Sequence, residues 1–462
     1  MKPTLVLNVV GLTPALLDHA PNLKALAARG AMRPLTTVLP AVTTTVQSTM
    51  LTGLAPRDHG IVANGWYFRE LSEIWLWRQS NRLVGGEKVW DAAKKRDPSF
   101  TCAQLFWWYN MYADVDYAVT PRPMYLADGR KLPDIHTHPS ALRDELQGAL
   151  GEFPLFRFWG PGADIVSSRW IAASALHMLQ QQRPTLTLVY LPHLDYDLQR
   201  YGPKHPGIPA QVAAVDALCA PLIDAAERAG GQVVALSEYG ITEVSHPVHV
   251  NRALRRAGWL KVRLERGLEQ LDAGASDAFA VADHQLAHVY VRRPELVAEV
   301  ADCLRALPGV ETVLDAAGKH AAGLDHARAG ELVAVARADS WFTYYHFLDD
   351  ARAPDFARTV EIHRKPGYDP VELFIDPTIR FPKLAVATRL ARKAIGMRYL
   401  MDVIGLDAGI VRGSHGRPTD DPREGPLFIT GTPGMLGEGP VPAASVKQLL
   451  LDHLFPGASH ES

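Results

Sequence analysis

The sequence has few cysteines and no paired ones. Only Cys102, Cys219 and Cys303 occur among its 462 residues, and no two of them form a Cys-x-x-Cys motif. An odd number of widely spaced thiols argues against a disulfide framework and indicates a reducing compartment. We therefore expect a cytoplasmic protein whose thiols are mostly buried.

Long apolar runs are also missing. The N-terminal segment MKPTLVLNVVGLTP has an apolar stretch of about seven residues that contains Asn8, and no cleavage-like site follows it. A secretory signal needs a longer apolar region, so we interpret this stretch as a first core strand. No run approaches the roughly 18 apolar residues of a membrane-spanning helix. Both absences support the cytoplasmic expectation.

The chain carries no excess charge of one sign. It has 48 Lys and Arg against 50 Asp and Glu, for a formal net charge of −2. This balance excludes a protein that holds a nucleic-acid polymer by bulk charge. The hydrophobic fraction of 47% is ordinary for a globular protein. At this length we expect one large domain with inserted parts.

Short apolar runs rich in β-branched residues alternate with longer amphipathic segments. We predict strands at 4–10, 185–191, 232–236 and 331–336, and helices at 20–30 and 210–228. This alternation is typical of a mostly parallel sheet with helices on both faces. Polar side chains follow three of the strands, namely Asn8, then His193 and Asp195, then Glu238 and Tyr239. Because ligands bind beyond the carboxyl ends of such strands, these residues mark a candidate site.

Two stretches, 65–83 and 106–125, concentrate aromatic residues above the chain average of 8%. Such clusters are typical of a core or a subdomain interface. The alternative is an insertion that roofs the site and offers walls for a base, a sugar or a lipid. We predict a catalytic domain over 1–416, with an aromatic-rich cap at about 65–160, a small subdomain at about 251–325 and a C-terminal wrap over 417–462.

A basic segment, 381–400, lies near the C-terminus. Its cations stand between apolar residues and are Lys383, Arg389, Arg392, Lys393 and Arg398. One interpretation is the solvated face of a packed helix. The other is a basic amphipathic helix that makes peripheral contact with a membrane surface.

The segment LPAVTTTVQSTMLTGLAPRDHGIVANGWY (39–67) is the most informative part of the chain. Three threonines precede a predicted helix that ends at Gly53. At a helix N-terminus, free backbone N–H groups and the helix dipole favour a phosphate and an alkoxide. Threonine is also a preferred capping residue, so an N-cap is the alternative role for Thr43.

This segment belongs to a series of short motifs along the chain. They are Val10-Gly11, Pro21-Asn22-Leu23, Pro40-Ala41-Val42-Thr43, Thr52-Gly53-Leu54-Ala55-Pro56, His59-Gly60-Ile61-Val62-Ala63-Asn64, Asp195 with Tyr201-Gly202-Pro203, Ser237-Glu238-Tyr239-Gly240 and Gly413-Ser414-His415-Gly416. The series resembles the nucleotide pyrophosphatase/phosphodiesterase branch of the alkaline phosphatase superfamily. The resemblance runs to about residue 416. It implies an alkaline phosphatase-like three-layer α/β sandwich with a central, mostly parallel sheet and inserted cap subdomains.

The resemblance also implies a reaction. It is hydrolysis of phosphodiester, pyrophosphate or related phosphoryl bonds with two zinc ions, and a phosphonate hydrolase on the same scaffold is an alternative. Thr43 would be the nucleophile and form a phospho-threonine, and Asn64 would donate to a phosphoryl oxygen. Asp195 would bind one metal together with the distant His415. The substrate would be a small-molecule or lipid-linked phosphoester.

The metal-ligand positions depart from the family pattern. The family's first Asp falls at Val10, a His falls at Gln199, and an Asp-His pair falls at Glu238-Tyr239. Asn8 lies two residues before Val10, so its side chain points to the same side of the strand. It is a candidate to replace the lost carboxylate with an amide oxygen.

The remaining ligand set is rich in oxygen, which suits Mg²⁺ or Mn²⁺ better than Zn²⁺. We predict one or two divalent ions, and we leave a changed ion or none open. The predicted ligands are Asp195, Glu238, His415 and His193, and the substituted positions are Asn8, Gln199 and Tyr239. Neighbours in a strand face opposite sides, so we do not expect the adjacent pair Asp283-His284 to chelate together. The rival prediction is a family member that has lost catalysis and acts as a binding or scaffolding protein in a membrane-associated, lipid-linked pathway.

Overall fold

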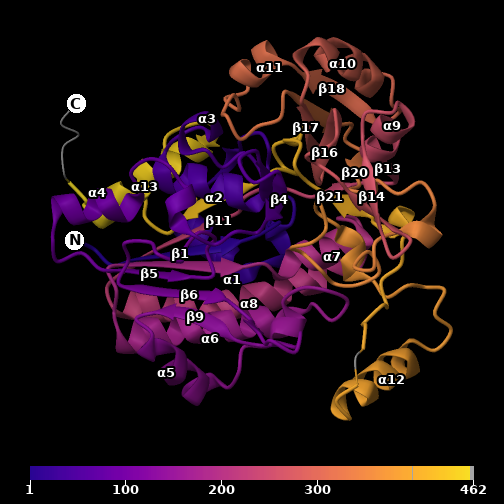
Figure 1. Ribbon diagram of the computed structural model, residues 1–462. Coiled ribbons are helices and arrows are strands. Elements are labelled where there is room, and N and C mark those ends of the chain that lie inside the picture. Colours follow the sequence, from indigo (N-terminus) through magenta and orange to yellow (C-terminus); the bar gives the residue numbers. More distant parts are fainter. Residues whose placement is uncertain (398, 458–462) are drawn as a thin grey trace.

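A nine-stranded sheet forms the centre of the molecule (Figure 1). The computed structural model describes residues 1–397 and 399–457. The strand order is β23-β2-β22-β11-β1-β10-β5-β6-β9. The bounds are β1 Thr4–Val9, β2 Ala31–Thr36, β5 Cys102–Leu105, β6 Tyr117–Pro121, β9 Ile135–His138, β10 Leu186–Leu191, β11 Gln232–Leu236, β22 Leu427–Thr430 and β23 Val441–Pro442.

The middle of this sheet is parallel. β1 lies between β10 and β11 and pairs with both in parallel, and β5 and β6 continue the parallel order, whereas β22 and β9 are antiparallel to their neighbours. All six residues of β1 are buried, so both faces of the strand need a covering layer. This arrangement confirms the predicted α/β class with a central, mostly parallel sheet.

Helices cover both faces of the sheet (Figure 1). On one face lie α1 Pro21–Arg29, α5 Ala141–Leu150, α6 Ile165–Gln181 and α8 Ile208–Arg228, and on the other lie α2 Thr43–Thr52, α4 Val89–Arg96 and α13 Val446–Leu454. Because consecutive parallel strands need crossover connections, this layering follows from the strand order. The carboxyl ends of β1, β10 and β11 therefore lie side by side at one edge.

Within the described residues, one helix, α8, is long and apolar enough to cross a membrane. This corrects the expectation that no segment approaches that length. In the structure α8 packs against β1, β11, α1 and α6. Its buried Asp216 accepts hydrogen bonds from the backbone N–H groups of Asn22 and Leu23 and from the Asn22 amide. These contacts are those of a core helix, so its composition says little about membranes.

A second sheet has four antiparallel strands in the order β16-β17-β19-β18. Their bounds are β16 Ala278–Asp283, β17 Leu286–Val291, β18 Val310–Leu314 and β19 Leu332–Ala336, with α9 Val250–Arg256 and α10 Val297–Arg305 nearby. The predicted strand 331–336 is therefore real, but it does not join the central sheet. It pairs antiparallel with β17 and β18, which precede it in the chain.

The aromatic-rich stretches divide between core and cavity. The first forms the hairpin of β3 (Gly65–Phe68) and β4 (Glu73–Leu76), and the second reaches β7 (Met124–Tyr125). Trp66 and Trp107 are buried, whereas Trp77 and Trp108 line a large cavity. Both interpretations of these stretches thus hold for different residues. The predicted boundaries of cap, subdomain and C-terminal wrap stay predictions.

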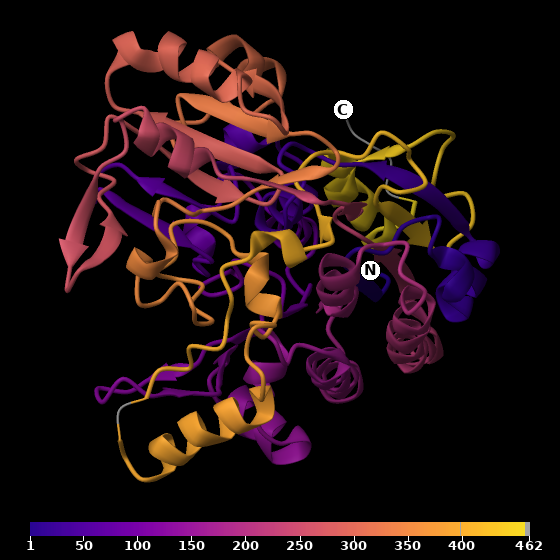
Figure 2. The ribbon, with the colours of Figure 1, turned by 90° about the vertical axis from the view of Figure 1, so that its right-hand side faces the viewer.

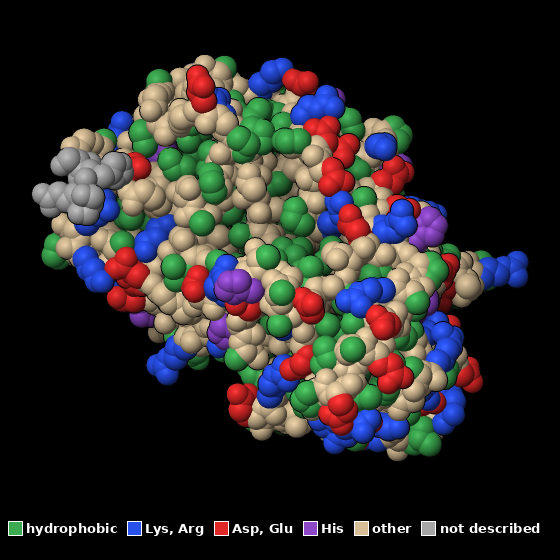
Figure 3. Space-filling view, turned by 90° about the horizontal axis from the view of Figure 1, so that it is seen from above, with side chains coloured by type: hydrophobic (Ala, Val, Ile, Leu, Met, Phe, Trp, Pro, Cys, Tyr) green, Lys and Arg blue, Asp and Glu red, His purple; other side chains and the backbone are tan. Residues whose placement is uncertain are grey.

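Charged side chains of both signs are mixed over the face seen in Figure 3, which fits the balanced composition. The remaining elements are α3 Pro56–His59, α7 His193–Tyr201, α11 Ala316–Ala321, α12 Pro382–Ala394, β8 Lys131–Leu132, β12 Thr242–Glu243, β13 His246–Val248, β14 Val262–Glu265, β15 Leu268–Leu271, β20 Ser340–Phe342 and β21 Gly413–Ser414. Of these, α7 and β21 carry residues to the candidate site.

The contact between α8 and α1 gives a stability prediction. Asp216→Ala is expected to lower the free energy of unfolding by about 2 kcal/mol, because the first turn of α1 loses a buried acceptor. Urea unfolding followed by circular dichroism measures the change. The matched control is Asp224→Ala on the exposed side of the same helix. Equal losses in the two variants would contradict this account.

Candidate active site

Thr43 is the first residue of α2, a helix whose ten residues are all buried. The N-cap position is occupied by Val42, which is extended and makes no side-chain capping bond. The capping role considered for Thr43 is therefore not the one it has. Its hydroxyl instead faces the carboxyl ends of the neighbouring strands, at the positive end of a helix dipole.

The Thr43 hydroxyl begins a chain of side-chain hydrogen bonds. Its Oγ1 lies 3.1 Å from the phenol oxygen of Tyr239, which donates to Asp195 Oδ1 at 3.2 Å. The second carboxylate oxygen, Asp195 Oδ2, accepts from Gln199 Nε2 at 2.7 Å. Tyr368 then donates to Gln199 Oε1 at 3.0 Å. Neutral donors thus occupy both oxygens of Asp195.

The helix α7 explains how Asp195 and Gln199 meet. The two residues are four positions apart, so they lie on one face of the helix and point to the same place. β10 ends directly before α7, which brings this face to the edge where β11 delivers Glu238 and Tyr239. The spacing in the sequence and the parallel sheet together build this part of the site.

Glu238 is held by amide groups. Its Oε1 accepts hydrogen bonds from Asn8 Nδ2 and Gln47 Nε2, each at 2.6 Å. Gln47 Oε1 in turn accepts from the backbone N–H of Trp108 at 2.8 Å, which fixes the orientation of the Gln47 amide. Glu238 Oε2 and Asn8 Oδ1 are buried and have no hydrogen-bond partner in the described part of the chain. Two unpaired acceptors therefore lie on neighbouring side chains.

Asn64 lies beside the nucleophile candidate and is anchored by Asp283. Its side-chain Oδ1 accepts from the backbone N–H of Thr44 at 3.1 Å. Its backbone N–H and its Nδ2 donate to the two oxygens of Asp283 at 2.7 and 3.1 Å. The Asn64 amide uses one of its two hydrogens in this way. Asp283 ends β16, so the second sheet helps to position the site.

Four rings form a continuous stack above the carboxylates. The rings of Tyr239 and His415 are stacked and almost parallel, with an interplanar angle of 6° and centroids 3.6 Å apart. His415 and His284 are 3.7 Å apart, and His284 and Tyr368 are 3.6 Å apart. Neither His284 nor Tyr368 was a predicted site residue. The acid–histidine pair Asp283-His284 was the available signal, because both side chains reach the site although they do not chelate together.

His415 is held at a distance from Asp195. Its Nδ1–H donates a hydrogen bond to the carbonyl oxygen of Ala41 at 2.8 Å. Its Nε2 lies 3.8 Å from Asp195 Oδ1. The structure thus brings together this predicted pair from segments more than two hundred residues apart in the sequence. His193, by contrast, pairs with Gln211 at 2.8 Å and does not line the cavity.

Burial dominates the electrostatics of the site. It raises the pKa of Asp195 to about 7, although the bonds from Gln199 and Tyr239 act in the opposite direction. It raises the pKa of Glu238 to about 8, although the bonds from Gln47 and Asn8 act in the opposite direction. Burial also lowers the pKa of His415 well below its ordinary value, so its imidazole is neutral. The carboxyls therefore have no fixed cation beside them to offset the cost of ionisation.

The donor set does not fit the two-zinc centre that the resemblance implies. In the described residues, no group of three or more His, Cys, Asp and Glu side chains could hold a metal ion. Gln199 and Tyr239 donate toward Asp195, where the family pattern has imidazole ligands. Two buried oxygens, Glu238 Oε2 and Asn8 Oδ1, are left without a hydrogen-bond partner in the described residues. Carboxylate and amide oxygens are the kind of donor that Mg²⁺ and Mn²⁺ prefer.

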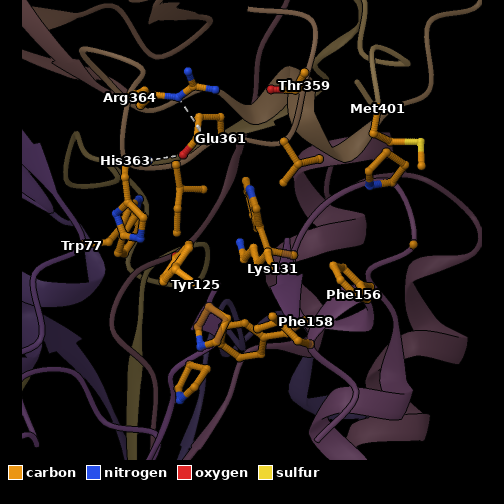
Figure 4. Close-up of a pocket in the computed structure, with 18 of the residues that line it drawn as sticks. Trp77, Tyr125, Lys131, Phe156, Phe158, Thr359, Glu361, His363, Arg364 and Met401 are labelled. Atoms are coloured by element: carbon orange, nitrogen blue, oxygen red, sulfur yellow. Dashed lines mark hydrogen bonds and ion pairs between the residues drawn. The ribbon is translucent and has the colours of Figure 1, made fainter. Parts of the chain in front are cut away.

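A cavity of about 1490 Å³ opens above these residues (Figure 4). Thr43, Asp195, Tyr239 and His415 lie among the residues that line it. Its other lining side chains include the aromatic residues Trp77, Trp108, Trp159, Tyr125, Phe156, Phe158 and Tyr368. Lys131 and Arg364 add positive charge to the wall (Figure 4). The cavity can hold a substrate with a large flat or apolar group.

Comparisons with known proteins relate most of the chain to one family. A sequence model described as type I phosphodiesterase / nucleotide pyrophosphatase matches residues 4–369. Phosphonoacetate hydrolase from Sinorhizobium meliloti, in complex with phosphonoformate, aligns with a TM-score of 0.62 and 16% sequence identity, over 98% of this chain and 96% of that chain. Murine ectonucleotide pyrophosphatase/phosphodiesterase 5 aligns with a TM-score of 0.59 and 15% identity, over 98% and 95%.

The search of curated proteins gives no match. The two solved structures are members of the alkaline phosphatase superfamily, so the predicted alkaline phosphatase-like fold is confirmed. At such low sequence identity, the structural likeness concerns the fold alone. The chemistry has to be argued from the residues of the site.

The Asn64–Asp283 contact gives a prediction with a built-in rescue. Asn64→Asp replaces a donor with a second carboxyl facing Asp283, and is expected to lower the free energy of unfolding by about 3 kcal/mol. Thermal and urea unfolding measure the loss. The exchanged pair Asn64→Asp with Asp283→Asn restores one donor and one acceptor, and should recover most of the lost free energy of unfolding. An exchanged pair as unstable as the single variant would contradict the contact.

Proposed function

Because this chain belongs to the type I phosphodiesterase / nucleotide pyrophosphatase family, we propose that it hydrolyses phosphodiester, pyrophosphate or related phosphoryl bonds with Thr43 as the nucleophile. One observation carries this proposal. Thr43 is the first residue of α2 and lines the cavity. Its hydroxyl contacts the phenol of Tyr239, which donates to the carboxylate of Asp195. A hydroxyl that is hydrogen-bonded through a phenol to a carboxylate base, at the N-terminus of a helix, is arranged for attack on phosphorus.

The Thr43 hydroxyl proton can be transferred to Asp195 through Tyr239. Thr43 Oγ1 donates to the Tyr239 oxygen, and Tyr239 donates to Asp195 Oδ1. As the Thr43 oxygen bonds to phosphorus, its proton passes to Tyr239, and the Tyr239 proton passes to Asp195. With its pKa raised to about 7, Asp195 accepts that proton near neutral pH more readily than an ordinary carboxylate. The bond from phosphorus to the leaving oxygen breaks, and the leaving oxygen takes a proton from solvent water, which regains one when the attacking water of the second step gives up its own.

The product of this step is a phospho-threonine at position 43. The N-terminal end of α2 and the amide hydrogen of Asn64 that does not serve Asp283 stabilise the phosphoryl oxygens. Water then attacks phosphorus, gives up a proton and releases Thr43. The protonated Asp195, through Tyr239, returns a proton to the departing Thr43 oxygen.

The proposal includes an altered metal site. Glu238 and Asn8 would hold one divalent cation through their unpaired oxygens. Mg²⁺ or Mn²⁺ is preferred over Zn²⁺, because no imidazole is among these ligands. When bound, the cation would supply positive charge against the phosphoryl oxygens beside Thr43.

The rival proposal is a binding or scaffolding protein in a membrane-associated, lipid-linked pathway. One observation favours it. Tyr239 lies flat against His415, and its hydroxyl fills the place between Thr43 and Asp195. A phenol there takes the place of a family metal ligand without supplying a charge. In this case the cavity would bind a phosphoester without cleaving it.

Thr43→Ala is expected to lower hydrolysis of a nitrophenyl phosphodiester by at least about a thousandfold, because the attacking oxygen is lost. Mass spectrometry of the acid-quenched wild type should find a phosphoryl group on the peptide that contains Thr43. The control is Thr45→Val in the same helix, since the Thr45 hydroxyl is buried without a partner and does not line the cavity. Full activity in Thr43→Ala rejects the nucleophile. No turnover by the wild type, with retained binding of a phosphoester, supports the rival.

Metal dependence is tested separately. Treatment with a chelator is expected to lower activity at least about tenfold, and Mg²⁺ or Mn²⁺ should restore it better than Zn²⁺. Glu238→Gln keeps the size of the side chain but removes its charge, so it should weaken Mn²⁺ binding measured by calorimetry. Unchanged activity in chelator, together with unchanged Mn²⁺ binding in Glu238→Gln, would reject the altered metal site and leave Thr43 untouched.

A further inference from the structure

Exposed apolar side chains gather around the mouth of the cavity. The described part of the chain has fifteen large hydrophobic side chains that are strongly exposed. Six of them lie within 381–400, namely Phe381, Leu384, Leu390, Ile395, Met397 and Leu400. Soluble proteins rarely concentrate exposed apolar side chains in this way unless the surface has a partner.

Two further segments contribute to the same surface. Met124 and Tyr125 on β7 are exposed, and so is Phe156 in the segment Leu155–Arg157. Tyr125 and Phe156 also line the cavity (Figure 4). Leu390 and Met397 line it as well. The exposed apolar surface is therefore continuous with the wall of the cavity, and its members come from three separate parts of the chain.

The helix α12 stands away from the body of the molecule (Figure 2). No residue of 381–400 in the described part is fully buried, so the interpretation of this segment as a packed helix does not hold for most of its length. Val386 packs against the neighbouring core, and Arg389 pairs with Asp402. Leu384 and Ile395 are 61% and 72% exposed. Ile395 directly follows α12, and its backbone N–H still bonds to the Ala391 carbonyl oxygen at 3.2 Å, as in a further helical residue. Eleven positions, about three helical turns, separate it from Leu384, so the two residues face nearly the same side.

The charge of this segment has one sign. Residues 380–400 contain six basic residues and no acidic one. Lys383 and Arg392 are exposed, and Arg380 lies 5.3 Å from the ring of Phe381. Arg398 and the side chain of Lys393 lie outside the described part. A short helix that combines exposed apolar residues with basic ones is typical of an interfacial helix on anionic lipid.

We propose that α12 and the mouth of the cavity dock on an anionic lipid surface. Leu384 and Ile395 insert between the acyl chains, and Lys383 and Arg392 contact the headgroups. Apolar side chains that surround an opening fit a lipid layer, because amphipathic molecules can then pass from the layer into the aromatic cavity without crossing water. This docking goes beyond the proposed hydrolysis and does not require Thr43 to act.

Co-sedimentation with vesicles tests the proposal. The full-length protein should bind vesicles of phosphatidylcholine with phosphatidylglycerol, bind phosphatidylcholine alone at least about tenfold more weakly, and be released by salt. The double variant Leu384→Glu with Ile395→Glu should lose at least about tenfold in affinity. The double variant Lys383→Gln with Arg392→Gln should lose about tenfold in affinity for the anionic vesicles, and its affinity for phosphatidylcholine vesicles should not change.

The controls separate docking from folding and from catalysis. Leu264→Glu changes a leucine that is 60% exposed on β14, away from the mouth, and should bind as the wild type does. Thr43→Ala should also bind normally, so a failure of the hydrolase proposal leaves this result intact. Far-ultraviolet circular dichroism checks that each variant is folded. The proposal is overturned if the wild type does not sediment with anionic vesicles, or if the Leu384 and Ile395 variant binds as well as the wild type.

Discussion

The phenol of Tyr239 is the contact on which the candidate site depends. Its oxygen lies between the hydroxyl of Thr43 and the carboxylate of Asp195, and its ring lies flat against His415. The phenol therefore joins three motifs that are far apart in the sequence. It also explains the altered character of the site. A phenol delivers a proton path where an imidazole would deliver a metal ligand.

The second constraint is the burial of carboxyl groups without nearby cations. Asp195, Glu238 and Asp283 all have raised pKa values, and burial is the first cause in each case. The side-chain amides of Asn8, Gln47, Gln199 and Asn64 offset part of this cost. The unpaired oxygens of Glu238 and Asn8 mark where this compensation is incomplete. A site of this kind gains stability from any bound group that brings positive charge.

The cavity connects the polar residues at its floor with an apolar exterior. Part of its aromatic wall, namely Trp77, Trp108 and Tyr125, comes from the stretches that the sequence marks by composition, and its outer rim includes residues of α12 and Phe156. A phosphoester with a long apolar part would meet polar groups only at the base, where Thr43 lies. The shape of the cavity and the surface around it therefore favour an amphipathic substrate, whichever of the two proposed functions applies.

Local patterns in the sequence were enough to predict β1, β10, β11 and the helix that begins at Thr43. These elements depend on apolar periodicity and on turn residues, which act over a few positions. The motif series was also enough to predict the family and the fold, because the spacing of short motifs survives when most residues change. The departures at Val10, Gln199, Glu238 and Tyr239 were visible for the same reason.

Only the tertiary structure decided what those departures do. The pairing of Asn8 with Glu238 spans 230 positions, and that of Asn64 with Asp283 spans 219. Strand 331–336 lies outside the central sheet because its partners are β17 and β18, and its own residues do not specify that choice. No motif in the sequence marked Tyr368 or Gln47 as site residues, and only the adjacent Asp283 marked His284. The sequence by itself determined the elements and the family, whereas long-range packing decided which side chains share the buried site and which hydrogen bonds they form.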